Sequence, residues 1–133
     1  MHTDEDKLNQ ITEQVIGCAF KVGNKLGFGF LEKCYKNALA LELSKLNLKV
    51  SPEHPIDVLY DGVVIGEYFA DLLVEDTVII ELKATKGIDP AHMAQCINYL
   101  VATGKPVCLL IHFGQRVEVK RIIRPGLDLR KPL

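Results

Sequence analysis

The sequence predicts one domain of mixed α/β class (α+β), in which a mixed five-stranded sheet is flanked by helices. Apolar residues recur at helical spacing through the first third of the chain. Runs rich in Val, Ile and Leu, separated by turn residues, follow in the middle. Near the end, a helical pattern separates two more runs of strand length, which indicates a right-handed crossover between parallel strands. A chain of 133 residues fits a single domain.

Two helices are predicted over about residues 6–47. The first, about residues 6–26, carries apolar side chains at helical spacing along one face. Gly27-Phe28-Gly29 ends it, because glycine accepts the left-handed dihedral angles of a helix terminus. The second helix covers about residues 30–47.

The sheet and its crossover helix are predicted over about residues 56–123. The prolines within residues 51–55 predict a connector, because proline interrupts regular structure. Asp61-Gly62 is a strong tight-turn signal. The predicted strands around it are residues 56–60, 63–74 and 77–84. Together they form an antiparallel meander.

One helix separates this meander from the last two strands. Asp89 is its predicted N-cap, Pro90 occupies the first helical position, and Gly104 ends it. We expect Ala94, Ile97, Leu100 and Val101 to pack against the sheet. The apolar strands that follow are residues 107–113 and about 117–123, and residues 124–133 form a basic tail.

Three charged residues, Asp71, Glu81 and Lys83, interrupt the apolar strands of the meander. Side chains alternate along a strand, so Glu81 and Lys83 share one face of the sheet. A three-residue turn at 75–77 puts Asp71 opposite Glu81 on that face, whereas a two-residue turn without a bulge sends it to the other. We expect the three-residue turn. Charges among core residues are costly unless they are paired or bind a metal, so the three together indicate a site.

Two neighbouring carboxylates beside an ammonium group suit metal-assisted hydrolysis of a phosphodiester. The carboxylates repel each other unless one is protonated or a cation lies between them. Mg²⁺ prefers carboxylate oxygens, keeps several waters and binds phosphate. The Lys83 ammonium can orient water or stabilise charge on the phosphate. The spacing alone also fits a Glu81–Lys83 ion pair on a half-exposed strand.

The helices supply further candidate residues. Glu32, in the first turn of the second helix, either interacts with the helix dipole or adds a third carboxylate to the strand site. One stripe of the crossover helix contains His92, Gln95, Cys96 and Tyr99. This stripe either faces the site or forms a partly exposed side of the helix.

The charge distribution allows only local attraction to nucleic acid. The net charge is −1, so the protein is not generally basic. From residue 115 onward six basic and two acidic residues give a net charge of +4. The candidate phosphate-binding residues are Lys86, Lys120, Arg121 and Arg124. The basic tail fits equally well a solvated end that balances the acidic N-terminus.

The cysteines and the lengths of the apolar runs indicate in which cell compartment the protein is expected. Cys18, Cys34, Cys96 and Cys108 form no Cys-x-x-Cys pair and lie in apolar surroundings. We expect four small buried thiols in a reducing cytosol. No apolar run has the length of a membrane span, and the N-terminus lacks a signal-peptide pattern. A cytoplasmic protein without membrane contact is therefore expected.

Read together, these residues resemble the GxxExxY protein family. Residues 29–35 fit the motif that names the family, through Gly29, Glu32 and Tyr35. The other matching features, in chain order, are Asp71, Glu81-Leu82-Lys83, Gln95 with Tyr99, and an apolar strand ending in Phe113-Gly114. The resemblance extends over about residues 11–123. It departs at Gly23, where the family often has a histidine, and at Phe28, where it often has a proline.

The GxxExxY family looks like a compact branch of the PD-(D/E)XK nuclease superfamily, so the resemblance implies a restriction-endonuclease-like core. It implies that Asp71 and Glu81 bind Mg²⁺ or Mn²⁺. It also implies that Lys83 assists the attacking water and that Glu32 completes the acidic cluster. A Gln-x-x-x-Tyr helix like that of Gln95 and Tyr99 lies beside the active site in some nuclease branches. The implied catalytic residues are Glu32, Asp71, Glu81, Lys83, Gln95 and Tyr99.

The leading hypothesis is a metal-dependent nuclease that hydrolyses phosphodiester bonds of DNA, with RNA as the less favoured substrate. One alternative is a catalytically silent nucleic-acid-binding module on the same fold. Another is a protein-interaction domain that forms a homodimer through an exposed sheet edge.

Overall fold

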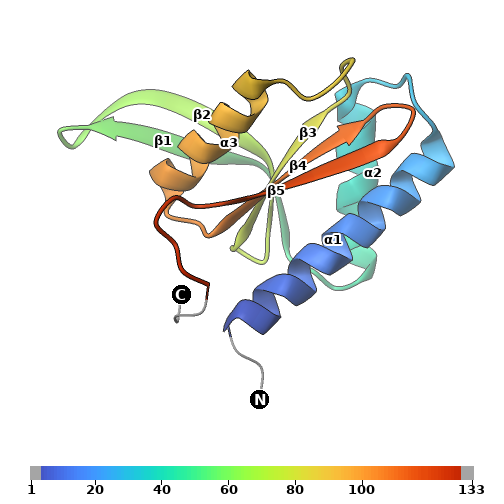
Figure 1. Ribbon diagram of the computed structural model, residues 1–133, viewed down its shortest axis with the longest axis horizontal. Coiled ribbons are helices and arrows are strands. Elements are labelled where there is room, and N and C mark those ends of the chain that lie inside the picture. Colours follow the sequence, from blue (N-terminus) through green and yellow to red (C-terminus); the bar gives the residue numbers. More distant parts are fainter. Residues whose placement is uncertain (1–3, 130–133) are drawn as a thin grey trace.

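A five-stranded sheet in the order β1-β2-β3-β4-β5 runs through the molecule, with helices packed on both faces (Figure 1). The computed structural model describes residues 4–129. Its elements are α1 (Asp4–Leu26), α2 (Glu32–Lys45), β1 (Val50–Tyr60), β2 (Val63–Val74), β3 (Val78–Lys83), α3 (Pro90–Thr103), β4 (Val107–Phe113) and β5 (Val117–Ile123). Strands β3 and β4 are parallel, and the other neighbouring pairs are antiparallel. The predicted mixed sheet with its crossover helix is confirmed.

The central strands β3 and β4 are buried on both faces, because each face of the sheet has its own core. On one face, α1 and α2 pack against strand residues that include Ile80, Leu82 and Ile111. On the other face, α3 packs against residues that include Ile79 and Leu110. Strands covered on both sides form continuous apolar runs, which is why the sequence predicts them well. Any ionisable side chain on β3 consequently lies in apolar surroundings.

The turn between β2 and β3 has three residues, as the sequence predicts. Val74 pairs with Val78, which leaves residues 75–77 as the turn. Continuing the same register along the two strands places Asp71 opposite Glu81.

The connector predicted at residues 51–55 is wrong, because β1 already begins at Val50. The sequence predicts a strand only from residue 56 onward. Pro52 and Pro55 are accommodated because β1 is an edge strand, and an edge strand needs no hydrogen bonds on its outer side.

Helix α3 begins and ends as predicted, but it packs through a different side. The Asp89 carboxylate accepts hydrogen bonds from the first turn, and Gly104 ends the helix with a φ of 72°. Of the four residues expected to face the sheet, Leu100 does so, whereas Val101 is 64% exposed. Ala94 and Ile97 are exposed too. The buried side consists of Cys96, Tyr99 and Leu100. The tyrosine ring is apolar enough to enter the core once its hydroxyl has a hydrogen-bond partner.

Three of the four cysteines are buried. Cys18, Cys96 and Cys108 are buried free thiols, but Cys34 is exposed, so the expectation of four buried thiols is wrong there. Cys34 precedes Tyr35 on α2, and the tyrosine takes the core-facing position.

Within residues 4–129, no helix combines the length and hydropathy needed to cross a bilayer.

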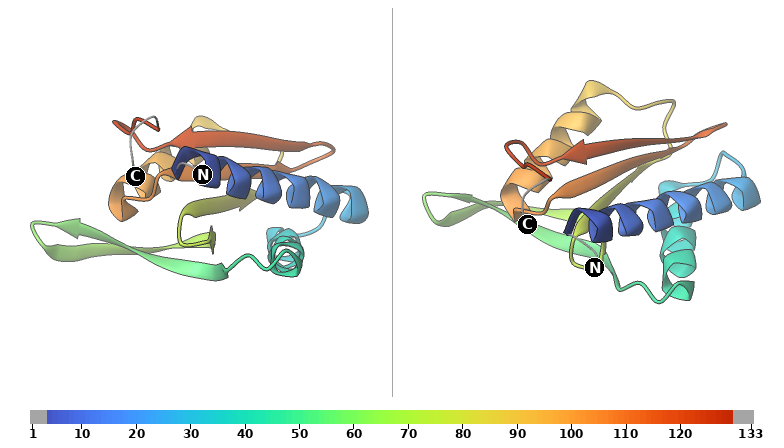
Figure 2. Two further views of the ribbon diagram at one scale, coloured as in Figure 1. Left: turned by 90° about the horizontal axis from the view of Figure 1, so that it is seen from below. Right: turned by 60° about the horizontal axis from the view of Figure 1, so that its bottom comes forward.

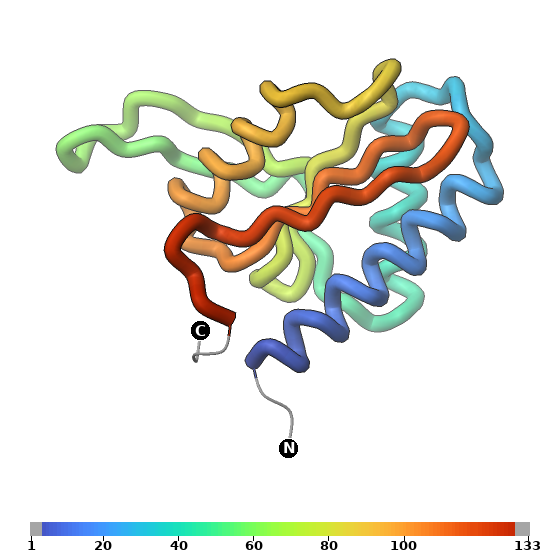
Figure 3. Tube along the Cα trace, in the orientation of Figure 1, coloured from blue at the N-terminus to red at the C-terminus, as the bar shows by residue number. Residues whose placement is uncertain are grey.

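The outer part of the β1–β2 hairpin projects beyond the rest of the molecule (Figures 2 and 3). We call residues 58–69 the arm. Its exposed large apolar side chains are Leu59, Tyr60, Val63, Val64, Ile65, Tyr68 and Phe69. An apolar surface of this extent is unusual for a protein that acts alone.

Candidate active site

Asp71 and Glu81 lie side by side where strands β2 and β3 stop pairing. The backbone N–H of Asp71 donates to Oε1 of Glu81 at 3.0 Å. The backbone N–H of Leu82 donates to Oδ2 of Asp71 at 2.8 Å. In a regular ladder these two N–H groups would donate to backbone carbonyls of the facing strand. Here the carboxylates accept the bonds instead. These two bonds fix the carboxyl groups relative to each other and to the sheet.

Burial makes the negative charges of this pair costly. Glu81 is only 4% exposed. Its burial, and then the charge of Asp71, raise the pKa of Glu81 to about 8. Burial also raises the pKa of Asp71, although the hydrogen bond from Leu82 opposes that shift. Without a cation, the pair therefore favours retaining a proton near neutral pH.

The donor set suits a hard divalent cation. Two buried carboxyl groups that repel each other offer oxygen ligands, and a cation between them relieves the repulsion. No group of three His, Cys, Asp or Glu side chains within residues 4–129 is arranged as a metal-ligand set. A cation here would take its protein ligands from Asp71 and Glu81 and fill its remaining positions with water or phosphate oxygens.

Charged residues on α2 and β3 surround the carboxylate pair. The negative charge of Glu32 raises the pKa of both Asp71 and Glu81, and the positive charge of Lys83 lowers both. Lys36 also lowers the pKa of Asp71 and pairs with Glu53 at 2.9 Å. Lys36 is not among the residues that the sequence pattern predicts for the site. Its position four residues after Glu32, on the same side of the helix, was the available signal.

Tyr35 holds the loop that leads into α2. The buried Tyr35 ring stacks on Phe113 with centroids 4.5 Å apart. Its hydroxyl donates to the carbonyl of Gly27 at 2.7 Å and accepts from the N–H of Phe30 at 3.3 Å. Gly29 has a φ of 105°, which favours glycine. The tyrosine and the glycine of the motif thus fix the loop immediately before Glu32.

Helix α3 brings Gln95 and Tyr99 to the face of the sheet that carries Glu81. The Gln95 amide donates to the Tyr99 hydroxyl at 3.0 Å. Burial, and then the charges of Glu81 and Asp71, raise the pKa of Tyr99 to about 12. The phenol therefore stays protonated near neutral pH and lies within electrostatic range of the carboxylates.

The structure does not gather the four predicted phosphate-binding residues in one patch. Lys120 and Arg121 are neighbours on β5, so their side chains leave opposite faces of the sheet. Arg121 donates to the side chain of Asn9 at 3.0 Å, and Arg124 donates to the carbonyl of Gly104. Lys86 lies elsewhere, beside a cavity after β3. The basic residues at 130 and 131 lie outside the described part of the chain.

Comparisons with known proteins bear on the family and on the fold. A family model described as "PD-(D/E)XK nuclease superfamily" matches residues 9–122. The fold is similar to that of an alkaline exonuclease, LHK-Exo, from Laribacter hongkongensis, with a TM-score of 0.50 and 15% identity over 85% of this chain and 82% of that one. It is also similar to SSO0001, with a TM-score of 0.50 and 20% identity over 74% of this chain and 52% of that one. No curated protein sequence matches.

Proposed function

Because the chain belongs to the PD-(D/E)XK nuclease superfamily, we propose that it is a divalent-metal-dependent nuclease whose active centre contains Asp71, Glu81 and Lys83. The observation that carries the proposal is the pair of carboxyl groups held together by hydrogen bonds at the end of the β2–β3 ladder. Nucleases of this superfamily generally use divalent metal ions. Within the superfamily we assign the chain to the GxxExxY family, on the strength of Gly29, Glu32 and Tyr35.

Each side chain has a distinct role in the proposed reaction. Asp71 and Glu81 would hold Mg²⁺ or Mn²⁺. When bound, the cation supplies a Lewis acid that polarises the scissile phosphate and lowers the pKa of a water molecule. Lys83, two residues after Glu81 on the same face, would donate hydrogen bonds to the attacking water or to a phosphate oxygen. Glu32 would add negative charge that strengthens cation binding.

Gln95 and Tyr99 are proposed to act beside the carboxylates. Their mutual hydrogen bond fixes the Tyr99 hydroxyl, and the raised pKa keeps it a proton donor. The pair would hold a phosphate oxygen or a bound water in place for the attack. We propose DNA as the substrate and the cytoplasm as the setting, where the free cysteines within residues 4–129 would stay reduced.

Cleavage assays with matched variants test this proposal. Plasmid, linear duplex, single-stranded DNA and RNA are each incubated with Mg²⁺ or Mn²⁺ and with EDTA. We expect metal-dependent cleavage of DNA that Asp71→Asn, Glu81→Gln and Lys83→Met each lower about 100-fold or more. Glu67→Gln, which changes an exposed acid on the same strand as Asp71, is the matched control and should retain activity. Cleavage that survives both Glu81→Gln and Lys83→Met contradicts the proposal.

We also propose that the arm binds a second copy of the chain. The arm carries only two charges, Asp61 and Glu67, so it offers a charged partner little to recognise. Its outer strand, β1, is a sheet edge whose outward backbone groups are available for pairing. Seven large apolar side chains, each 47–67% exposed, supply apolar area on the two faces of the arm, and one of these faces together with the paired edges would form the interface.

Oligomeric state tests the dimer. Light scattering after size-exclusion chromatography should give the mass of two chains for the wild type and of one chain for Ile65→Lys. Ile65 is 63% exposed, so the substitution should leave the fold intact. Leu41→Lys, on the similarly exposed face of α2, is the control and should remain a dimer. A monomeric wild type at micromolar concentration contradicts the proposal.

A further inference from the structure

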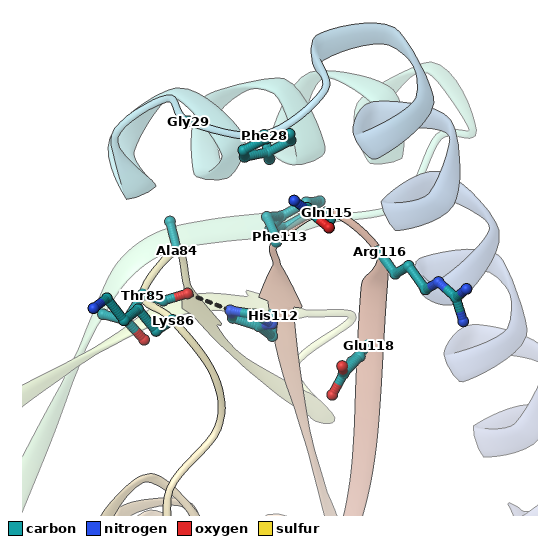
Figure 4. Close-up of a pocket in the computed structure, with 11 residues that line it drawn as sticks. Phe28, Gly29, Ala84, Thr85, Lys86, His112, Phe113, Gln115, Arg116 and Glu118 are labelled. Atoms are coloured by element: carbon teal, nitrogen blue, oxygen red, sulfur yellow. Dashed lines mark hydrogen bonds between the residues drawn. The ribbon is translucent and has the colours of Figure 1, made fainter.

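A cavity of about 650 Å³ opens at the carboxyl ends of β3 and β4 (Figure 4). The loop between α1 and α2 forms one wall, and the loop after β3 forms the other. Such a volume falls in the range of small-ligand sites. Its lining includes the ring of Phe28, the cations Lys86 and Arg116, the polar side chains of Thr85, His112 and Gln115, and one carboxylate, Glu118.

On both walls of the cavity, lining residues are close in sequence to residues of the carboxylate site. Ala84, which lines it, directly follows Lys83 and lies three residues beyond Glu81, which is about 10 Å along an extended strand. On the opposite wall, Gly29 precedes Glu32 by three residues. A nucleic-acid strand with one phosphate at the carboxylates can therefore reach the cavity with a neighbouring nucleotide.

Phe28 gives the cavity a fixed aromatic surface. The side chain is 61% exposed, although it is large and apolar. The loop that carries it is held by the bond from Tyr35 to the adjacent Gly27 carbonyl. Figure 4 shows the Phe28 ring on the side of the cavity facing Ala84 and the end of β4. An exposed ring held in this way suits stacking on a nucleobase, because every base has an apolar face.

His112, on the side of the cavity opposite Phe28, has one ring nitrogen without a hydrogen-bond partner among the described residues. It is 5% exposed, and its Nε2 bonds to the carbonyl of Thr85. Because a carbonyl only accepts, Nε2 carries the hydrogen and Nδ1 is left as an acceptor, for which the described residues supply no partner. At Gly114 a Cβ would come within 2.7 Å of the ring, so the backbone packs closely against the imidazole there, and Nδ1 itself is buried.

The rim of the cavity carries two cations on different sides. In Figure 4, Lys86 lies next to Thr85 and Arg116 lies beyond Gln115. Neither Lys86 nor Arg116 forms an ion pair with a carboxylate among residues 4–129. An aromatic surface between cations is the arrangement that binds single-stranded nucleic acid.

We propose that this cavity binds one unstacked nucleotide of a single-stranded substrate, next to the phosphate that is cleaved. The base stacks on Phe28, and Lys86 and Arg116 hold the flanking phosphates. A paired, stacked base cannot enter, so single strands, flaps and frayed ends are preferred over intact duplex. This inference rests on the proposed nuclease function and specifies its substrate.

Binding without cleavage tests the cavity separately from the chemistry. Fluorescence anisotropy in EDTA measures the affinity for a labelled single-stranded 12-mer and for the same sequence as a duplex. We expect Phe28→Ala to weaken single-strand binding about fivefold or more while duplex binding changes less than twofold. Phe28→Trp should restore single-strand binding. Lys86→Met should reduce the slope of log affinity against log salt by about 0.7.

Phe20→Ala is the matched control, because Phe20 is an exposed phenylalanine on α1 that does not line the cavity. Circular dichroism melting checks that all variants fold. The proposal is overturned if Phe28→Ala changes single-strand affinity less than twofold, or if Phe20→Ala changes it equally. If binding depends on Phe28 but no substrate is cleaved with any metal, the nuclease function fails while the nucleotide site stands.

Discussion

Glu81 and Asp71 are joined by hydrogen bonds at the end of the β2–β3 ladder. The Glu81 carboxylate accepts from the backbone N–H of Asp71, and the Asp71 carboxylate accepts from the backbone N–H of Leu82, which follows Glu81. The bonds hold two acids together in a place where burial opposes their charges. Above the pKa of Glu81, the metal-free protein therefore has a repulsion that a bound cation would remove.

Glu81→Gln should make stability less dependent on pH. In the wild type, the pKa of Glu81 is about 8 in the folded protein and near 4.5 in the unfolded chain. The unfolded chain thus binds fewer protons between these values, and stability falls as pH rises from 4.5 to 8, by on the order of 4 kcal/mol. Urea unfolding in EDTA across this pH range measures the effect. Glu67→Gln should keep the wild-type slope, and an unchanged slope in Glu81→Gln contradicts the prediction.

Mg²⁺ or Mn²⁺ should raise the melting temperature more at pH 8.5 than at pH 6.5. Glu81 must lose its proton before it ligates the cation, so binding weakens below its pKa of about 8. A cation at 100 times its Kd adds about 2.7 kcal/mol of stability, which corresponds to several degrees. Differential scanning fluorimetry with metal titrations gives the shift. Asp71→Asn should abolish it at both pH values, and equal shifts for the wild type at both would count against the prediction.

Tyr35→Phe should destabilise the protein by about 1–3 kcal/mol. The variant keeps the stack on Phe113, but Gly27 and Phe30 lose their hydrogen bonds to the hydroxyl. Urea denaturation measures the loss. Tyr60→Phe removes a hydroxyl from a side chain that is 67% exposed, and it should change stability by less than about 0.5 kcal/mol. Similar losses in both variants would show that the loop does not depend on Tyr35.

Gly23→Ala should destabilise, although alanine normally favours a helix. A Cβ at Gly23 would lie 2.3 Å from Cγ2 of Val117, so α1 and β5 would have to move apart. Such overpacking costs about 1–3 kcal/mol, more than the roughly 1 kcal/mol gained in helix propensity. In a Val117→Ala background the same change should become stabilising, and thermal melts of the four proteins test this. A stabilising effect in both backgrounds would contradict the steric explanation.

The close contact between Gly23 and Val117 also explains a departure noted in the sequence. The family that the sequence resembles often has a histidine at this position, and such a side chain would meet Val117 unless β5 shifted. Here the position packs α1 against β5 and lies outside the carboxylate site. No local pattern around residue 23 reveals this, because Val117 is distant in the chain.

Local signals predicted the elements well, and long-range packing explains the errors. Asp89 and Gly104 mark the ends of α3 through their own backbone and side-chain preferences, so the sequence predicts them directly. Pro52 lies within a strand, contrary to the prediction of a connector, because the sheet places β1 at its edge, where a proline can be accommodated. The packing side of α3 was misjudged because it depends on the Gln95–Tyr99 bond and the core opposite.

The candidate site shows the same division. Alternation along β3 and the length of the turn bring Asp71, Glu81 and Lys83 to one face, and both are visible in the sequence. The position of Glu32 depends instead on the stack between Tyr35 and Phe113, residues that are far apart in the chain. Lys36 was missed because nothing in the strand pattern points to α2.

The turn at residues 75–77 lies at the opposite end of the ladder from the carboxylates, yet it determines whether they meet. Because the turn has an odd number of residues, the two acids lie on the same face of the sheet, and the same relation should hold in related chains. Natural deletion or insertion of one residue in this hairpin would rotate one acid out of the site while leaving every reactive group in the sequence. Homologues with an intact Asp, Glu and Lys but an even turn, and no compensating bulge, should therefore be inactive, and turn length can separate them from enzymes when genomes are surveyed.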